Sequence, residues 1–190
     1  FTPSTLVLDA PFVMDQGEGL KMWKPENYGK KFYGPSTLRV GIEKSRNLMT
    51  VRVAQKVGFD EISKITKNFG IYDNVPELLS VSLGSAETTL VKLTNAYCTF
   101  VNGGKKVEPI FIDRIQNRRG KTVYKADKRK CVGCQEISYL KEDLPTIQDN
   151  RKQIISKETA YQITSMMEGV IDRGTGRKLR NLNLNLAGKT

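Results

Sequence analysis

Residues 34–50, GPSTLRVGIEKSRNLMT, contain a helical pattern that three polar residues interrupt. The apolar positions at helical spacing are Leu38, Ile42 and Met49. The interruption is Ser45-Arg46-Asn47, and it predicts a junction between a short helix capped by Ser36 and a second helix, from about 49 to 56, that stops at Gly58. At such a junction a hydroxyl and an amide can point into a cleft. A capping serine and a turn asparagine explain the same residues, and on these three alone that structural interpretation is favoured.

The last residues of the chain favour a functional interpretation of Ser45-Arg46-Asn47 instead. Residues 182–190, LNLNLAGKT, alternate between apolar and polar side chains and predict a strand that ends in Lys189-Thr190. A Ser-x-Asn on a helical connection, followed far downstream by Lys-Thr on a strand, matches two of the three signatures of penicillin-recognising serine enzymes.

The chain resembles class A penicillin-binding proteins along nearly its whole length, with a gap around residues 125–153. The stretches that carry the resemblance are Thr2-Pro3-Ser4-Thr5, Asp9-Ala10-Pro11, Trp23-Lys24-Pro25-Glu26-Asn27-Tyr28, Tyr33-Gly34-Pro35, Leu38-Arg39, Ser45-Arg46-Asn47, Leu83-Gly84 with Glu87, Ala96-Tyr97, Asn102-Gly103-Gly104, Arg173-Gly174-Thr175-Gly176 and Ala187-Gly188-Lys189-Thr190. The resemblance implies that residues 1–190 are a partial transpeptidase (penicillin-binding) domain. The implied fold is mainly α within an α/β penicillin-binding/β-lactamase-like transpeptidase fold, incomplete here, with a helical region, a β-hairpin and a terminal strand.

Periodicity elsewhere predicts further helices and the hairpin. The expected elements are a helix over about 60–68 ended by Gly70, a helix capped by Ser85 and stopped by Gly103-Gly104, a hairpin near 108–124, an insertion-like surface loop over about 125–153, and a last helix capped by Ser156 that runs to Gly174. In that last helix Ala160, Ile163, Met167 and Val170 form the apolar stripe.

The formal net charge of +11 raises the alternative of a nucleic-acid-binding module. Basic residues gather at 118–121, 128–130 and 177–180, but apart from Tyr124 no aromatic residues interleave with them as stacking platforms. A solvated basic face is therefore favoured, with no nucleic-acid partner. No apolar run approaches the roughly 18 residues of a membrane helix. Because the chain starts at Phe1 and stops at Thr190, one residue short of a complete Lys-Thr-Gly motif, we expect it to be a piece of a longer protein.

Two motif matches are interpreted as chance. Ser138-Tyr139-Leu140-Lys141 spells Ser-x-x-Lys, but the family order places that motif before Ser-x-Asn, and the expected surface loop is a poor place for a preorganised nucleophile. Gly188-Lys189-Thr190 imitates the end of a phosphate-binding loop. Asn183 stands where that loop requires its first glycine, so the nucleotide interpretation fails.

The three cysteines allow several roles. Cys131 and Cys134 form a Cys-x-x-Cys pair, for which a local disulfide or idle thiols are favoured over zinc and, last, redox catalysis. The chain has no histidine that could complete a zinc site, and no metal or other cofactor is expected. Cys98 is expected to be a buried small hydrophobe in a helix.

The resemblance implies acyl transfer onto a serine, with peptidoglycan stem peptides as substrates and β-lactams as inhibitors. By similarity, Ser45 relays a proton to the leaving nitrogen and Asn47 holds a substrate amide. Lys189 supplies positive potential, and Thr190 binds the terminal carboxylate. The longer protein would be anchored in the inner membrane on its periplasmic side, and the resemblance suggests that a glycosyltransferase domain precedes this one.

The chain departs from the family pattern at the nucleophile. The acylated serine and its lysine are expected shortly before Phe1, and the glycine expected after Thr190, which belongs to the strand that supplies an oxyanion donor, is absent. The 190-residue chain alone is therefore expected to be inactive. The alternatives left open are a nucleic-acid or zinc-binding module and a non-catalytic scaffolding relative.

Overall fold

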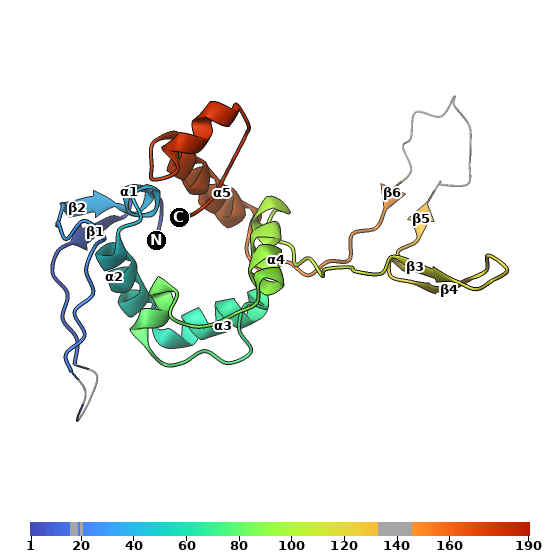
Figure 1. Ribbon diagram of the computed structural model, residues 1–190, viewed down its shortest axis with the longest axis horizontal. Helices are drawn as coiled ribbons and strands as arrows, with labels where there is room; N and C mark the ends of the chain where they lie inside the picture. Colours follow the sequence, from blue (N-terminus) through green and yellow to red (C-terminus); the bar gives the residue numbers. More distant parts are fainter. Residues whose placement is uncertain (16–18, 20, 133–145) are drawn as a thin grey trace.

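The computed structural model describes residues 1–15, 19, 21–132 and 146–190. Its helices follow one another around a ring, and a narrow arm leaves the ring between α4 and α5 (Figure 1). The ring closes because α5 packs on both α4 and α1. The helical elements are α1 (Leu38–Glu43), α2 (Asn47–Val57), α3 (Phe59–Phe69), η1 (Leu79–Leu83), α4 (Leu90–Val101), α5 (Lys157–Asp172) and η2 (Arg177–Leu182), where η1 and η2 are 3-10 helices.

A strand pair leads directly into α1. β1 (Leu6–Asp9) and β2 (Gly34–Thr37) are antiparallel, with Asp9 opposite Gly34. The predicted cap Ser36 is wrong, because Ser36 lies inside β2 opposite Val7. Thr37 caps α1 instead, and its Oγ1 accepts a hydrogen bond from the Val40 N–H at 3.3 Å.

The other helix ends agree with the sequence in part. α2 stops at Gly58 and α3 at Gly70, as predicted, and Ser156 caps α5. The predicted cap of α4 at Ser85 is wrong. Thr89 caps α4 because its Oγ1 accepts from the Lys92 N–H at 3.2 Å, while the Ser85 hydroxyl contacts that of Ser80.

The packed core that steadies the Ser45 region is small. Leu48 and Val51 of α2 are fully buried against Phe12, and Trp23 meets the Phe12 ring edge-on at 6.2 Å. The predicted stripe of α5 is buried at Ala160, Met167 and Val170, whereas Ile163 is half-buried. Cys98 is exposed on α4, which corrects the expectation that it is buried.

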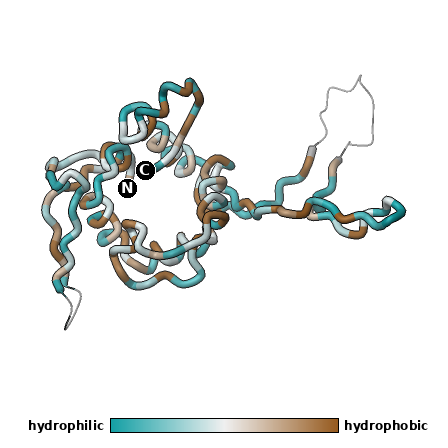
Figure 2. Tube along the Cα trace, viewed as in Figure 1, coloured by the Kyte–Doolittle hydropathy of each residue, from teal (hydrophilic) through white to brown (hydrophobic). Residues whose placement is uncertain are grey.

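The arm is built from β3 (Arg114–Gln116), β4 (Thr122–Lys125), β5 (Cys131–Val132) and β6 (Thr146–Ile147). The hairpin predicted at 108–124 forms between β3 and β4 only, with a register shift after Ile115. Figure 2 shows hydrophilic residues at its tip and hydrophobic residues along α4. The interpretation of residues 125–153 as an insertion stays a prediction, and part of that segment lies outside the described residues.

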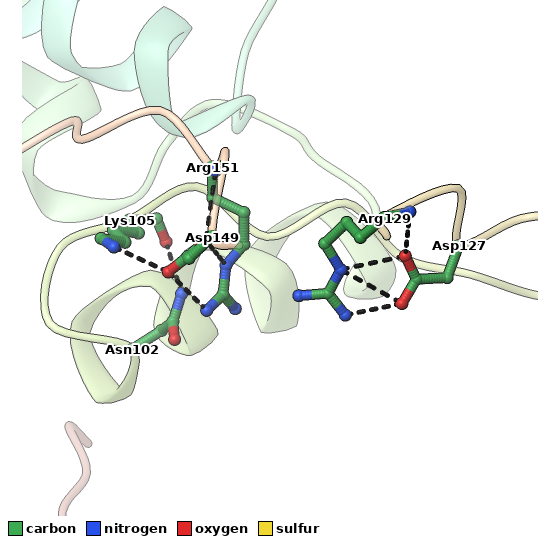
Figure 3. Close-up of polar contacts among 6 residues, drawn as sticks. All are labelled: Asn102, Lys105, Asp127, Arg129, Asp149 and Arg151. Carbon is green, nitrogen blue, oxygen red and sulfur yellow. Dashed lines mark hydrogen bonds and ion pairs between the residues drawn. The ribbon is translucent and has the colours of Figure 1, made fainter. Parts of the chain in front are cut away.

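Ion pairs lie at the base of the arm, and the one between Lys105 and Asp149 joins its two chain segments (Figure 3). Asp149 accepts from Lys105 at 2.7 Å and from Arg151 at 2.8 Å, and these hydrogen bonds hold its pKa well below the usual range. Asp127 and Arg129 form a second pair at 2.6 Å, which likewise lowers the pKa of Asp127. Both carboxylates therefore keep their charge to a lower pH than an ordinary aspartate does.

The strand predicted at 182–190 is not formed. η2 reaches Leu182, Asn183 adopts a left-handed conformation with φ of 50°, and residues 184–190 have no regular structure. No strand among the described residues lies beside this segment, and a single extended segment cannot form a ladder. No helix in the described part of the chain is long and apolar enough to cross a membrane.

Candidate active site

Ser45 lies at the helix–helix junction that its sequence pattern predicts. It follows the last turn of α1 and precedes α2, with φ of 53°. The Ser45 N–H donates to Ile42 O at 3.2 Å, and the Arg46 N–H donates to Gly41 O at 2.9 Å. These two bonds are the Schellman pattern that ends helices, in which the left-handed position usually holds glycine. The backbone at Ser45 is strained because serine disfavours a left-handed conformation, and strained residues are common at functional sites.

A glycine at position 45 should therefore give a more stable fold than an alanine there. A non-glycine residue in the left-handed region costs about 1 kcal/mol, which glycine does not incur. Urea unfolding of the chain, followed by the fluorescence of Trp23, should show Ser45→Gly more stable than Ser45→Ala by about that amount. An alanine variant as stable as the glycine variant would show that the junction is unstrained.

Lys189 meets Ser45 although 144 residues separate them. Lys189 Nζ donates to Ser45 Oγ at 2.6 Å and also to the main-chain oxygen of Thr190. Ser45 Oγ donates to that same Thr190 oxygen at 3.2 Å. The segment that delivers Lys189 is fixed to α5, because the Gly188 N–H donates to Met167 O at 3.2 Å. Serine hydroxyl and lysine amine therefore form one contact without the predicted strand.

The environment of Lys189 changes its acidity. Much of the side chain is exposed, but the amine beside Ser45 is partly removed from water. This desolvation lowers the pKa of Lys189, since burial disfavours the charged form. The amine therefore gives up its proton more readily than an ordinary surface lysine.

Asn47 and Thr190, the other two predicted site residues, make further contacts near the chain segments of Ser45 and Lys189. Asn47 is the first residue of α2, and its Nδ2 donates to Glu26 O at 2.9 Å, which ties the N-terminal loop to the junction. The Thr190 hydroxyl lies 2.5 Å from the Thr175 hydroxyl, just beyond α5. The structure thus joins Ser45, Lys189 and Thr190 directly and places Asn47 two residues away.

A buried network behind the junction was missed by the sequence analysis. Asp9 is fully buried and accepts from Asn27 Nδ2 at 2.7 Å, and Asn27 Oδ1 accepts from the Leu48 N–H. Arg46 completes the network, with its Nε 3.9 Å from Asp9 and its guanidinium 3.3 Å from the centroid of the Tyr33 ring. Asp9, Asn27 and Tyr33 each lie in a stretch of the resemblance, but no periodicity indicates that a carboxylate is buried there.

Other candidate groups lie elsewhere or outside the described residues. A cavity of about 570 Å³ lies within the arm and has Lys106, Lys128 and Arg151 in its wall, far along the chain from Ser45. Cys131 is disulfide-bonded, whereas Cys134 and the rejected Ser138 motif fall outside the described residues.

The comparisons identify the family. The model of the penicillin-binding protein transpeptidase domain matches residues 1–190. The chain belongs to this family. Penicillin-binding protein 1A of Rickettsia bellii is 43% identical over 99% of the chain, which confirms the resemblance to the class A group. The chain spans 24% of that relative's length.

Solved structures agree with this assignment of fold. Penicillin-binding protein 1A from Haemophilus influenzae superposes with a TM-score of 0.79 at 30% identity, over 95% of this chain and 29% of that one. PonA1 from Mycobacterium tuberculosis, solved in complex with penicillin V, has a TM-score of 0.68 at 17% identity, over 90% of this chain and 42% of that one. The predicted fold class, a partial and mostly helical transpeptidase fold, is confirmed.

Proposed function

We propose that the chain is part of a peptidoglycan DD-transpeptidase that cross-links stem peptides by acyl transfer through a serine and is a target of β-lactams. The observation that carries the proposal is the 2.6 Å contact between Lys189 and Ser45, in a chain that matches the family over all its residues. Two motifs far apart in the sequence meet, and shared chemistry would need such a contact.

In the proposed reaction, a serine outside this chain attacks the carbonyl of the penultimate D-alanine. The acyl–serine bond forms and the peptide C–N bond breaks. The hydroxyl proton of the attacking serine would pass to the lysine of its own motif, and the departing amine must receive a proton in return. Ser45 would relay that proton from the lysine of the nucleophile's motif to the departing amine. Lys189 donates to one lone pair of Ser45 Oγ, and the single Ser45 O–H, which here donates to Thr190 O, would turn to the departing amine when substrate is bound. A stem-peptide amine then displaces the serine and completes the cross-link.

Lys189, Thr190 and Asn47 would orient the substrate. The charged amine of Lys189 attracts the terminal carboxylate of the stem peptide or of a β-lactam, and the Thr190 hydroxyl donates a hydrogen bond to that carboxylate. Asn47 Nδ2 is engaged with Glu26, so its amide oxygen is the group that faces a substrate N–H in this proposal.

The cellular setting follows from the same proposal. The longer protein would be held in the inner membrane with this domain in the periplasm. The disulfide of Cys131 would be stable in that compartment, because disulfides persist under oxidising conditions and are rare in the cytosol. The positive net charge of +11 would face anionic envelope polymers.

A fluorescent penicillin tests the proposal. It should label covalently a longer protein that contains this chain together with the preceding Ser-x-x-Lys motif and the following glycine. It should leave the 190-residue chain unlabelled, because contacts from half a site cannot trap the drug without the nucleophile. A longer protein that folds and remains unlabelled would contradict the proposal and favour a non-catalytic scaffolding relative.

A further inference from the structure

Glu43 is a buried carboxylate two residues before Ser45. Its side chain is 6% exposed, and Arg173 Nη2 lies 2.6 Å from Oε1. Arg39, one turn earlier on α1, approaches the same oxygen at 3.7 Å. A buried carboxylate needs such partners because an uncompensated buried charge is costly. The pair joins the last turn of α1 to the end of α5.

Two hydrogen bonds to main-chain oxygens reinforce this link between α1 and α5. The Thr175 N–H donates to Glu43 O at 3.1 Å, and Lys44 Nζ donates to Arg173 O. The residues on both sides of the Glu43–Arg173 pair are therefore held to one another. The backbone just before Ser45 cannot move without the segment that follows α5.

Two glycines let α5 come this close. A Cβ on Gly169 would overlap the Glu43 carboxylate, and a Cβ on Gly174 would overlap Glu43 O. Gly174 belongs to the Arg-Gly-Thr-Gly stretch of the resemblance, and the structure gives it a steric role beside Ser45. The close approach leaves Glu43 no room to change its position independently of α5.

The same segment reaches the other half of the site. The Thr175 hydroxyl lies 2.5 Å from the Thr190 hydroxyl, and the neighbouring Lys189 contacts Ser45. A closed circuit of contacts thus runs from Ser45 back to Glu43, across to Arg173, on to Thr175 and Thr190, and returns through Lys189.

We propose that Glu43 is a positioning residue that acts through Arg173 and Thr175 to set the distance between Ser45 and the Lys189–Thr190 segment. This inference rests on the proposed function. It assigns no substrate contact to Glu43, whose carboxylate is covered. It predicts instead that the geometry of proton delivery depends on the ion pair, because a shift of about 1 Å in a reacting group can cost about 10²-fold in rate.

The test uses acylation of the longer protein by a fluorescent penicillin. Glu43→Gln keeps the shape of the side chain and removes its charge. It should slow acylation by about 10²-fold while the fraction finally labelled stays complete. A purely structural role would lower the labelled fraction and leave the rate of the folded remainder unchanged. The matched control is Asp73→Asn, which breaks the exposed ion pair with Lys92 and should leave the rate unchanged.

A double-mutant cycle separates positioning from a general effect. In a protein that already carries Ser45→Ala, Glu43→Gln should cause little further slowing, since residues that act as a unit are not additive. Equal slowing in both backgrounds would overturn the inference.

A second variant decides the matter if Glu43→Gln fails to fold. Thr175→Val leaves the buried pair intact and removes the hydroxyl contact with Thr190, so it should slow acylation by about 10-fold at full labelling. If the Thr175→Val protein reacts as fast as the longer protein without this substitution, the inference about Glu43 is overturned and the proposed function still stands. If the longer protein without any substitution remains unlabelled, the proposed function is overturned, and this inference with it.

Discussion

Replacing Ser45 by alanine in the longer protein should slow acylation by a penicillin by about 10²–10⁴-fold, the usual contribution of a positioned proton-transfer group. Alanine removes the hydroxyl that lies 2.6 Å from Lys189 and leaves the junction otherwise intact. The acylation rate is measured by stopping the reaction at intervals and quantifying the covalent label. In the proposed mechanism the drug's carboxylate would still contact Lys189 and Thr190, so the loss should appear in the rate of the covalent step.

The matched control for this experiment is Ser138→Ala. Ser138 belongs to the Ser-x-x-Lys match that the sequence order argues against, so its removal should leave the acylation rate unchanged. A Ser45→Ala protein that reacts at the parent rate would remove Ser45 from the proton path, whatever its distance from Lys189.

Replacing Lys189 by methionine should slow acylation by about 10²–10³-fold, comparable to the loss of one preorganised electrostatic donor. Methionine keeps most of the length of the side chain and removes its charge and its hydrogen bond to Ser45. The control is Lys178→Met in η2, which removes an exposed charge away from this contact. A normal rate in Lys189→Met would show that the contact with Ser45 is incidental.

Because the pKa of Lys189 is lowered, Lys189→Met should also change how the acylation rate depends on pH. Desolvation places the pKa of the amine below that of an ordinary lysine, so its positive charge is lost at a lower pH as the pH rises. Acylation by the parent protein should therefore decline on the alkaline side earlier than an ordinary lysine would cause. In Lys189→Met this alkaline decline should be absent.

Local signals in the sequence predict much of this fold. The helix stops at Gly58 and Gly70 and the cap at Ser156 are correct because each depends on a few neighbouring residues. The caps at Ser36 and Ser85 are wrong because strand pairing and a hydroxyl contact with Ser80 engage those serines. The alternation in 182–190 predicts a strand, but no neighbouring strand among the described residues is there to pair with it.

The candidate site was also predictable from the sequence only in part. The spacing of Ser45 and Asn47, with Lys189 and Thr190, indicates the motif residues through the family resemblance. Their support is not visible in the sequence: Asp9 and Glu43 are charged residues whose burial arises only when distant segments pack around them. Likewise, the left-handed conformation of Ser45 is known only from the backbone.

The most direct measurement is the mass-spectrometric mapping of the serine that a penicillin acylates in the longer protein. We expect the adduct on the serine of a Ser-x-x-Lys motif outside residues 1–190, and on no peptide of this chain. Ser45 should influence the rate of that modification without being modified. An adduct on Ser45 or on Ser138 would contradict the proposed mechanism, because the nucleophile would then lie within this chain.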